Sequence, residues 1–413
     1  MEKIRVEWEE LAELAVTKGI NLQKNQVVHI DAPAETVWFV RMLTKKSFEN
    51  GAKDVIVNWT DHEVGRERYL HAAEDAKWVS EGESLERLAY AKEGAGLISV
   101  RSPRFGLFDG VEDARAGAIR SAEANAYREV SALRMSAVCT WTVVMLPNEE
   151  WAKLVYPSLS TEEAMEKLTD AILKCSRVEK GRTIENWKQH RENCEKYANR
   201  LTDWNFEYLK YKNNRGTELR VGLAKGHKWC GGGVYSTKNL PFIPNIPTEE
   251  IATVPDWRKT EGTVVSTMPL IYAGGLIEGI HLKFEAGKVV EFSADKGQEL
   301  LESLLNTDDG AKRLGEAAIV PVSCPITKCE TLFYNTIFDE NASCHLALGN
   351  GYPMCLKNGD GITGEELTEL GVNHESALHV DFMIGSDDLD ITGITYEGKE
   401  IPVLRNGEWV IGE

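Results

Sequence analysis

The chain has 413 residues, 42% of them hydrophobic and 27% charged, and its 65 acidic and 47 basic residues give a net charge of −18. This length predicts at least two folded domains, and the negative charge argues against nucleic acid or an anionic membrane as a partner. No stretch reaches the roughly 20 apolar residues of a membrane span, and the acidic amino terminus lacks a signal-peptide core, so we expect a cytoplasmic protein.

The first 205 residues alternate strand-like and helix-like patterns. An apolar stretch at 26–30 is followed by a helical stretch at 33–50, then Gly51, then a second apolar stretch at 54–59. A right-handed crossover is the default between two such strands, so this unit predicts parallel pairing. We therefore predict an α/β domain with a mostly parallel sheet over residues 1–205. Further strands are expected at 95–100 and 139–146, and helices at 160–175, where Ser160 and Glu163 have capping-box spacing, and at 184–201.

From residue 206 the pattern changes to strands joined by tight turns. Hairpins are predicted at 206–223, 279–294 and 394–411, with glycine or asparagine at each turn. A helix is expected at 298–305. We therefore predict a mostly antiparallel, β-rich (α+β) metal-binding domain over residues 206–413.

Four segments of this second part carry side chains suited to a divalent metal. Their mixture of carboxylates and imidazoles favours Zn²⁺, Co²⁺ or Mn²⁺. In one of them, strand geometry would place His379 and Asp381 on one face and Val380 and Phe382 on the other. The segments are "NIPTEE" (245–250), "GEAAIVP" (315–321), "FDENASCHLALG" (338–349) and "HVDFMIGS" (379–386).

Each segment by itself also has a plainer interpretation. The last can be an amphipathic strand with a solvated polar face. Thr248 can cap a short helical turn, where acidic residues are favourable. Glu316 can simply be exposed at the entrance of a strand, although Gly315 beside it would allow close approach of another backbone or an ion.

The third segment and the residues after it raise two questions of geometry. Glu340 and His345 are five residues apart, so they do not share a helical face, and a turn between them would be needed for both to converge. Tyr352 precedes Pro353 and is therefore biased towards an extended conformation. Its hydroxyl can stabilise an oxyanion, or the ring can simply pack in the core.

Taken together, these segments resemble the thermophilic metallo-aminopeptidase family, of the aminopeptidase T and aminopeptidase S type. The resemblance covers essentially the whole chain, including "RSP" at 101–103 and "LPNEEWA" at 146–152, and the stretch at 226–242 is the part that we do not match. It implies a metal-dependent aminopeptidase that hydrolyses the amino-terminal peptide bond of short peptides by a metal-activated water. It also implies two divalent ions per subunit (Zn, Co, Mn or Mg) and a homodimer.

By position, the resemblance assigns roles to particular residues of this chain. Tyr352 matches the active-site tyrosine. The resemblance leaves the bridging ligand open, and we expect Glu316 or Asp381 to bridge the two ions. General acid–base chemistry, independent of the resemblance, offers Glu340 or Glu249 as general base, with Glu340 preferred. The implied metal ligands are Glu250, Glu316, His345, His379 and Asp381, with Glu340 in or next to that shell.

Three alternatives come from other functional classes. The first is a dinuclear metallohydrolase of another small-molecule class, such as a phosphoesterase, although the four segments bring no cationic phosphate contacts. The second is a non-catalytic peptide-binding metalloprotein. The third is a nucleotide-binding α/β protein, but no G-x-G-x-x-G follows residues 26–30 and the chain has no P-loop.

Overall fold

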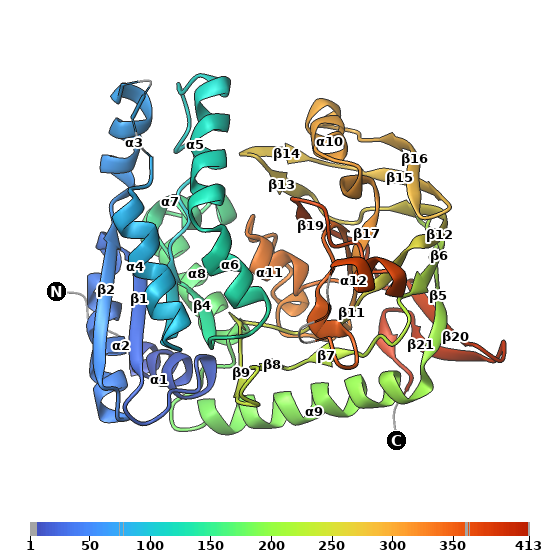
Figure 1. Cartoon of the computed structure of the whole chain (residues 1–413), viewed down its shortest axis with the longest axis horizontal. Coiled ribbons are helices and arrows are strands. Elements are labelled where there is room, and N and C mark those ends of the chain that lie inside the picture. Colours follow the sequence, from blue (N-terminus) through green and yellow to red (C-terminus); the bar gives the residue numbers. More distant parts are fainter. Residues whose placement is uncertain (1–5, 74, 77, 360–361, 363, 412–413) are drawn as a thin grey trace. The chain divides into compact units, whose positions relative to one another are not determined.

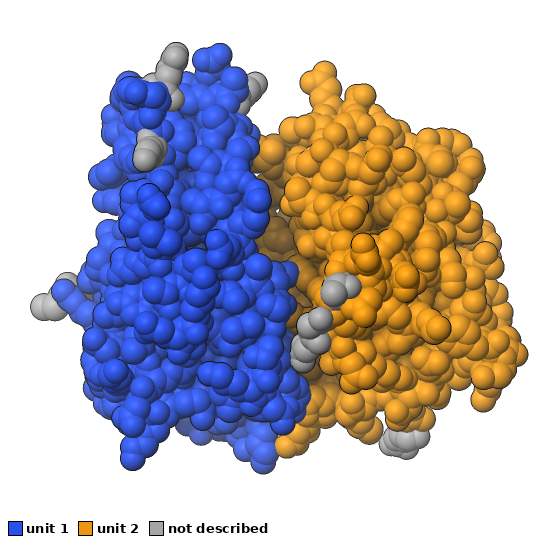
Figure 2. Space-filling view, viewed as in Figure 1, with its two compact units in different colours: residues 1–188, 233–247 blue, residues 189–232, 248–413 orange. Residues whose placement is uncertain are grey.

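The computed structural model describes residues 6–411 except positions 74, 77, 360, 361 and 363 (Figure 1). The first five residues of the predicted acidic amino terminus lie outside this range. The chain forms two compact units, which we describe separately (Figure 2). Unit 1 comprises residues 1–188 and 233–247, and unit 2 comprises residues 189–232 and 248–413.

Unit 1 is built on a five-stranded sheet in which every pair of neighbours is parallel. Strands β1, β2, β3 and β4 are the four that the sequence predicts, and the fifth comes from the segment at 233–247. The α/β amino-terminal part with a parallel sheet is therefore confirmed. In sheet order the strands are β10 (Asn245–Ile246), β4 (Trp141–Met145), β3 (Gly96–Arg101), β1 (Val27–Pro33) and β2 (Asp54–Thr60).

Local chemistry marks the end of one helix of unit 1 and the start of another. Helix α2 stops at Glu49, before Gly51, whose φ of +90° favours glycine. The predicted capping box of α8 is present, because Ser160 and Glu163 each accept a hydrogen bond from the other's backbone N–H. The helices are α1 (Val6–Leu14), α2 (Val37–Glu49), α3 (His62–His71), α4 (Glu81–Lys92), α5 (Asp113–Ala126), α6 (Arg128–Met135), α7 (Glu149–Val155) and α8 (Thr161–Cys175).

Helix α9 (Thr183–Trp204) contains the point at which the two units divide, between Lys188 and Gln189. The boundary that the sequence places near residue 205 falls just after the end of this helix. Among the helices that the structure describes, none combines the length and apolar character that a bilayer crossing requires.

Unit 2 contains an eight-stranded antiparallel sheet, which confirms the predicted β-rich part and its three hairpins. Gly287 and Gly407 adopt positive φ at two of the turns, as hairpin loops require. In sheet order the strands are β16 (Lys288–Ser293), β15 (His281–Glu285), β12 (Pro255–Val265), β6 (Glu218–Leu223), β5 (Phe206–Lys212), β20 (Asp390–Thr395), β21 (Glu400–Arg405) and β22 (Glu408–Trp409).

A second, five-stranded antiparallel sheet of unit 2 carries the predicted ligands. A single hydrophobic core contains residues of both sheets, such as Phe206 and Phe382, and residues of helix α10 (Gln298–Leu305). This helix lies where the sequence predicts it. Strands β17 (Leu314–Ile319) and β18 (His345–Gly349) are wholly buried, so this sheet is a rigid support. Its strands in order are β19 (His379–Met383), β18 (His345–Gly349), β17 (Leu314–Ile319), β11 (Ile251–Thr253) and β7 (Cys230–Gly231), and α11 (Thr336–Glu340) and α12 (Gly364–Leu370) complete the unit.

Candidate metal centre

The register of the five-stranded sheet places four predicted ligands on one face. Ala347 of β18 pairs with Glu316 of β17 on one side and with Asp381 of β19 on the other. Paired residues share a face, and so do residues two apart along a strand, so His345 and His379 point the same way. The small side chain of Ala347 therefore lies between the two carboxylates in the sheet.

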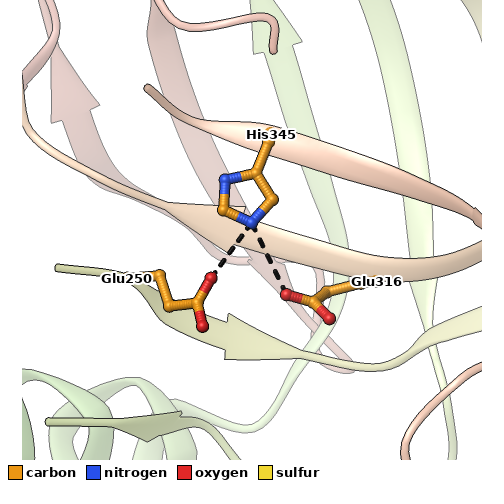
Figure 3. A group of neighbouring side chains, drawn as sticks. All are labelled: Glu250, Glu316 and His345. Atoms are coloured by element: carbon orange, nitrogen blue, oxygen red, sulfur yellow. Dashed lines mark ion pairs between the residues drawn. The ribbon is translucent and has the colours of Figure 1, made fainter. Parts of the chain in front are cut away.

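The ligand atoms converge in two groups that share one residue. Among the described residues, one ligand atom each from Glu250, Glu316 and His345 lies within 4.8 Å of the others, and the same holds for Glu316, His379 and Asp381. Figure 3 shows the first group, in which His345 Nε2 lies 3.1 Å from Glu250 Oε2 and 3.6 Å from Glu316 Oε1. In the second group, His379 Nε2 lies 3.3 Å from Glu316 Oε2 and 3.5 Å from Asp381 Oδ1. Glu316 thus presents one oxygen to each imidazole.

Backbone carbonyls determine the orientation of both imidazoles. His345 Nδ1 lies 2.9 Å from the carbonyl oxygen of Glu340 and 3.0 Å from that of Ser343, and His379 Nδ1 lies 2.7 Å from that of Asn350. A carbonyl only accepts hydrogen bonds, so Nδ1 carries the proton in each ring and Nε2 faces the carboxylates. Metal-binding histidines in proteins are held in this way.

The site is strongly charged for a buried position. Burial would raise the pKa of Glu316, but its close contacts with the His345 and His379 imidazoles and their positive charge lower it to about 2. Burial would lower the pKa of both imidazoles, and the neighbouring carboxylates instead raise it well above 6.5. The pKa of Glu250 is raised, first by burial and then by the charges of Glu316 and Asp381.

Two buried atoms support the fit of a divalent cation to these residues. His345 Nε2 and Asp381 Oδ1 are shielded from solvent and have no partner of hydrogen-bond geometry among the described residues. Their nearest charged neighbours are other members of the two ligand groups, and a cation between them would give both atoms a partner.

Comparison with known proteins identifies the family. A family model described as "Thermophilic metalloprotease (M29)" matches residues 5–409. The chain belongs to this family. "Aminopeptidase 2" of Geobacillus stearothermophilus is 40% identical over 412 residues, 99% of either chain. "Aminopeptidase AmpS" of Bacillus subtilis is 40% identical over 399 residues, 96% of this chain and 97% of that one.

A solved structure agrees with this assignment. "Wild-type AmpT from Thermus thermophilus" superposes with a TM-score of 0.92 at 37% identity, over 98% of this chain and 99% of the other. The family expected from the four sequence segments is therefore confirmed, and the protein is a metallo-aminopeptidase of the M29 family.

Glu340 of this M29 metalloprotease lies beside the two groups and belongs to neither. Its pKa is raised well above 4.5, first by burial and then by the charges of Asp381 and Glu250. Its neighbour Asp339 instead accepts the backbone N–H groups of Phe333 and Asn335, both at 2.8 Å, and so closes a loop. Glu249 also belongs to neither group.

Tyr352 packs against the second group. Its ring centroid lies 4.3 Å from that of His379 at an interplanar angle of 34°, and its backbone is extended ahead of Pro353, as expected. Burial raises the pKa of Tyr352 well above 10, and the charges of Glu316 and Asp381 add to this effect. The phenol therefore keeps its proton and can act as a hydrogen-bond donor.

The structure also decides between the alternatives for single segments. The helical turn that Thr248 could cap is not formed, because residues 248–250 are not helical and lead into β11. An exposed Glu316 is wrong, since its side chain is only 7% exposed. The interpretation of residues 379–386 as a strand with a solvated polar face is wrong too, because the Asp381 side chain is only 11% exposed. A turn does connect Glu340 and His345.

Sequence reasoning missed the groups that orient the ligands. The carbonyls of Glu340, Ser343 and Asn350 hold the imidazoles, and a backbone carbonyl leaves no side-chain signal. It also missed Asn341 of the segment 338–349, whose side chain accepts the backbone N–H of Glu249 and donates to the carboxylate of Glu340.

Proposed function

We propose that this metallo-aminopeptidase holds two divalent ions and removes the amino-terminal residue of short peptides. The observation that carries the proposal is that Glu316 belongs to both ligand groups. Glu250 and His345 would hold one ion, His379 and Asp381 the other, and Glu316 would bridge them. The two imidazoles favour Zn²⁺, Co²⁺ or Mn²⁺ over Mg²⁺.

Two such ions supply Lewis-acid chemistry, activating a water and polarising the scissile carbonyl. The residues of the chain supply the rest. Tyr352, whose pKa is raised, donates a hydrogen bond to the oxyanion of the tetrahedral intermediate. Glu340 lies beside the ligand groups and its raised pKa suits a general base, so it takes the proton from water and passes it to the leaving amine. The charges of Asp381 and Glu250 act on the Glu340 carboxyl group, and this supports Glu340 as the base.

Recognition of the free α-amine would explain the exopeptidase action. That amine is a cation at neutral pH, and a site carboxylate that pairs with it would hold only the first residue of a peptide against the reacting centre. An acetylated peptide lacks this charge and should be a poor substrate.

The test is metal removal followed by separate addition of Zn²⁺, Co²⁺, Mn²⁺ or Mg²⁺. Bound metal is measured by elemental analysis, and hydrolysis is measured with dipeptides, their N-acetylated forms and a phosphomonoester. We expect two ions per chain and metal-dependent cleavage of the unmodified dipeptides alone. Cleavage of the phosphomonoester would favour another class of hydrolase, and binding of dipeptides without cleavage under every metal would favour a peptide-binding metalloprotein.

Three further expectations stay predictions. The homodimer and the restriction to short peptides come from the resemblance, and the cytoplasmic location comes from the amino-terminal sequence. Light scattering coupled to size-exclusion chromatography measures the first, and a series of peptides of increasing length measures the second.

A further inference from the structure

One fully buried amide side chain, Asn341, connects two parts of the candidate metal centre. It directly follows α11 and has an exposed fraction of 0%. Its Oδ1 accepts the backbone N–H of Glu249 at 2.7 Å and that of Glu250 at 3.3 Å. Its Nδ2 donates to the carbonyl oxygen of Ile337 at 2.9 Å and to Glu340 Oε1 at 3.3 Å.

These four contacts use the whole hydrogen-bonding capacity of an amide. Asparagine has two acceptor positions on its oxygen and two donors on its nitrogen, and Asn341 fills all of them. The two backbone N–H groups also determine which end of the amide is oxygen, because they can only donate. No other side chain of this size offers two donors and two acceptors in this arrangement.

We propose that Asn341 is a positioning residue for the dinuclear site, an inference that rests on the proposed function. Its oxygen holds the backbone of Glu250, whose carboxylate lies 3.1 Å from His345 Nε2. Its nitrogen holds the carboxylate of Glu340. One side chain therefore sets the position of the proposed base relative to the first ligand group.

The two variants Asn341→Asp and Asn341→Ser test this role. The first keeps the size and the acceptor oxygen but places a second oxygen against two acceptors, one of them the carboxylate of Glu340. The second removes the amide without added charge, and it remains informative should the first variant fail to fold. Asn213→Asp is the matched control, because Asn213 Oδ1 also accepts two backbone N–H groups, those of Arg215 and Thr217, both at 3.0 Å, in the turn between β5 and β6.

The readouts are the affinity of metal-free protein for Co²⁺, followed by absorbance, the values of kcat and KM for a dipeptide, and the melting temperature. We expect both Asn341 variants to lose about 10- to 100-fold in Co²⁺ affinity or kcat, with little change in KM, and the control to stay near wild type.

Two results would overturn the inference. One is Co²⁺ affinity and kcat near wild type in both Asn341 variants. The other is activity lost only in proportion to the unfolded fraction. If wild-type protein binds Co²⁺ but cleaves no peptide, the proposed function fails, and the Co²⁺ affinities still decide the role of Asn341.

Discussion

Replacement of Glu316 by glutamine is the sharpest test of the shared ligand. Glutamine keeps the shape of the side chain but exchanges one oxygen for an NH₂ group, which is not a metal ligand, and it removes the negative charge. Glu316 Oε1 lies 3.6 Å from His345 Nε2 and Oε2 lies 3.3 Å from His379 Nε2, so the substitution affects both groups whichever way the amide turns.

The magnitude follows from the two contacts. If each lost charge-assisted contact costs about 1.5–3 kcal/mol, two cost about 3–6 kcal/mol. At about 1.4 kcal/mol per factor of ten, this predicts a metal affinity lower by about 10²- to 10⁴-fold for the variant. Cleavage should be lost at metal concentrations that saturate wild-type protein.

The assay is titration of metal-free protein with Co²⁺ or Zn²⁺, with bound metal counted after removal of the excess. Glu261→Gln is the control, since it makes the same change of charge on an exposed residue of β12. A Glu316→Gln protein that still binds two ions and cleaves dipeptides at the wild-type rate would refute the assignment of Glu316 as the shared ligand.

Other parts of the structure give further predictions. Tyr352→Phe should lower kcat about 10²-fold with little change in KM, and an unchanged kcat in steady-state assays would remove the phenol from the mechanism. His227 is fully buried, which lowers its pKa to about 4. The unfolded state alone binds this proton between about pH 6.5 and 4, so the unfolding free energy should fall by up to about 3 kcal/mol as pH falls, and His227→Asn should flatten that fall in denaturant titrations. A Cβ at Gly315 would overlap the carbonyl oxygens of Gly349 and Asn350, so Gly315→Ala should lower the melting temperature and activity together, and wild-type values would contradict that packing.

Much of the fold was predictable from local patterns. Strands β1 to β4 of unit 1, the three hairpins of unit 2, the capping box at Ser160 and the helix at 298–305 all lie where the sequence places them. These features depend on hydrophobic periodicity, on turn residues and on contacts over three or four positions. The short fifth strand β10 was not predicted, because two residues leave no periodic signal and its pairing with β4 comes from a distant segment.

The same contrast between local and long-range information applies to the candidate site. The sequence by itself determined which side chains are available, and strand alternation already placed His379 and Asp381 on one face with Phe382 on the other. Alternation cannot say which strands are neighbours. Only the tertiary structure decided that β17, β18 and β19 pair in the register that sets Glu316 and Asp381 on either side of Ala347. Register depends on contacts between residues far apart in the chain, and for that reason the sharing of Glu316 between two ligand groups and the contacts of Asn341 emerged only in three dimensions.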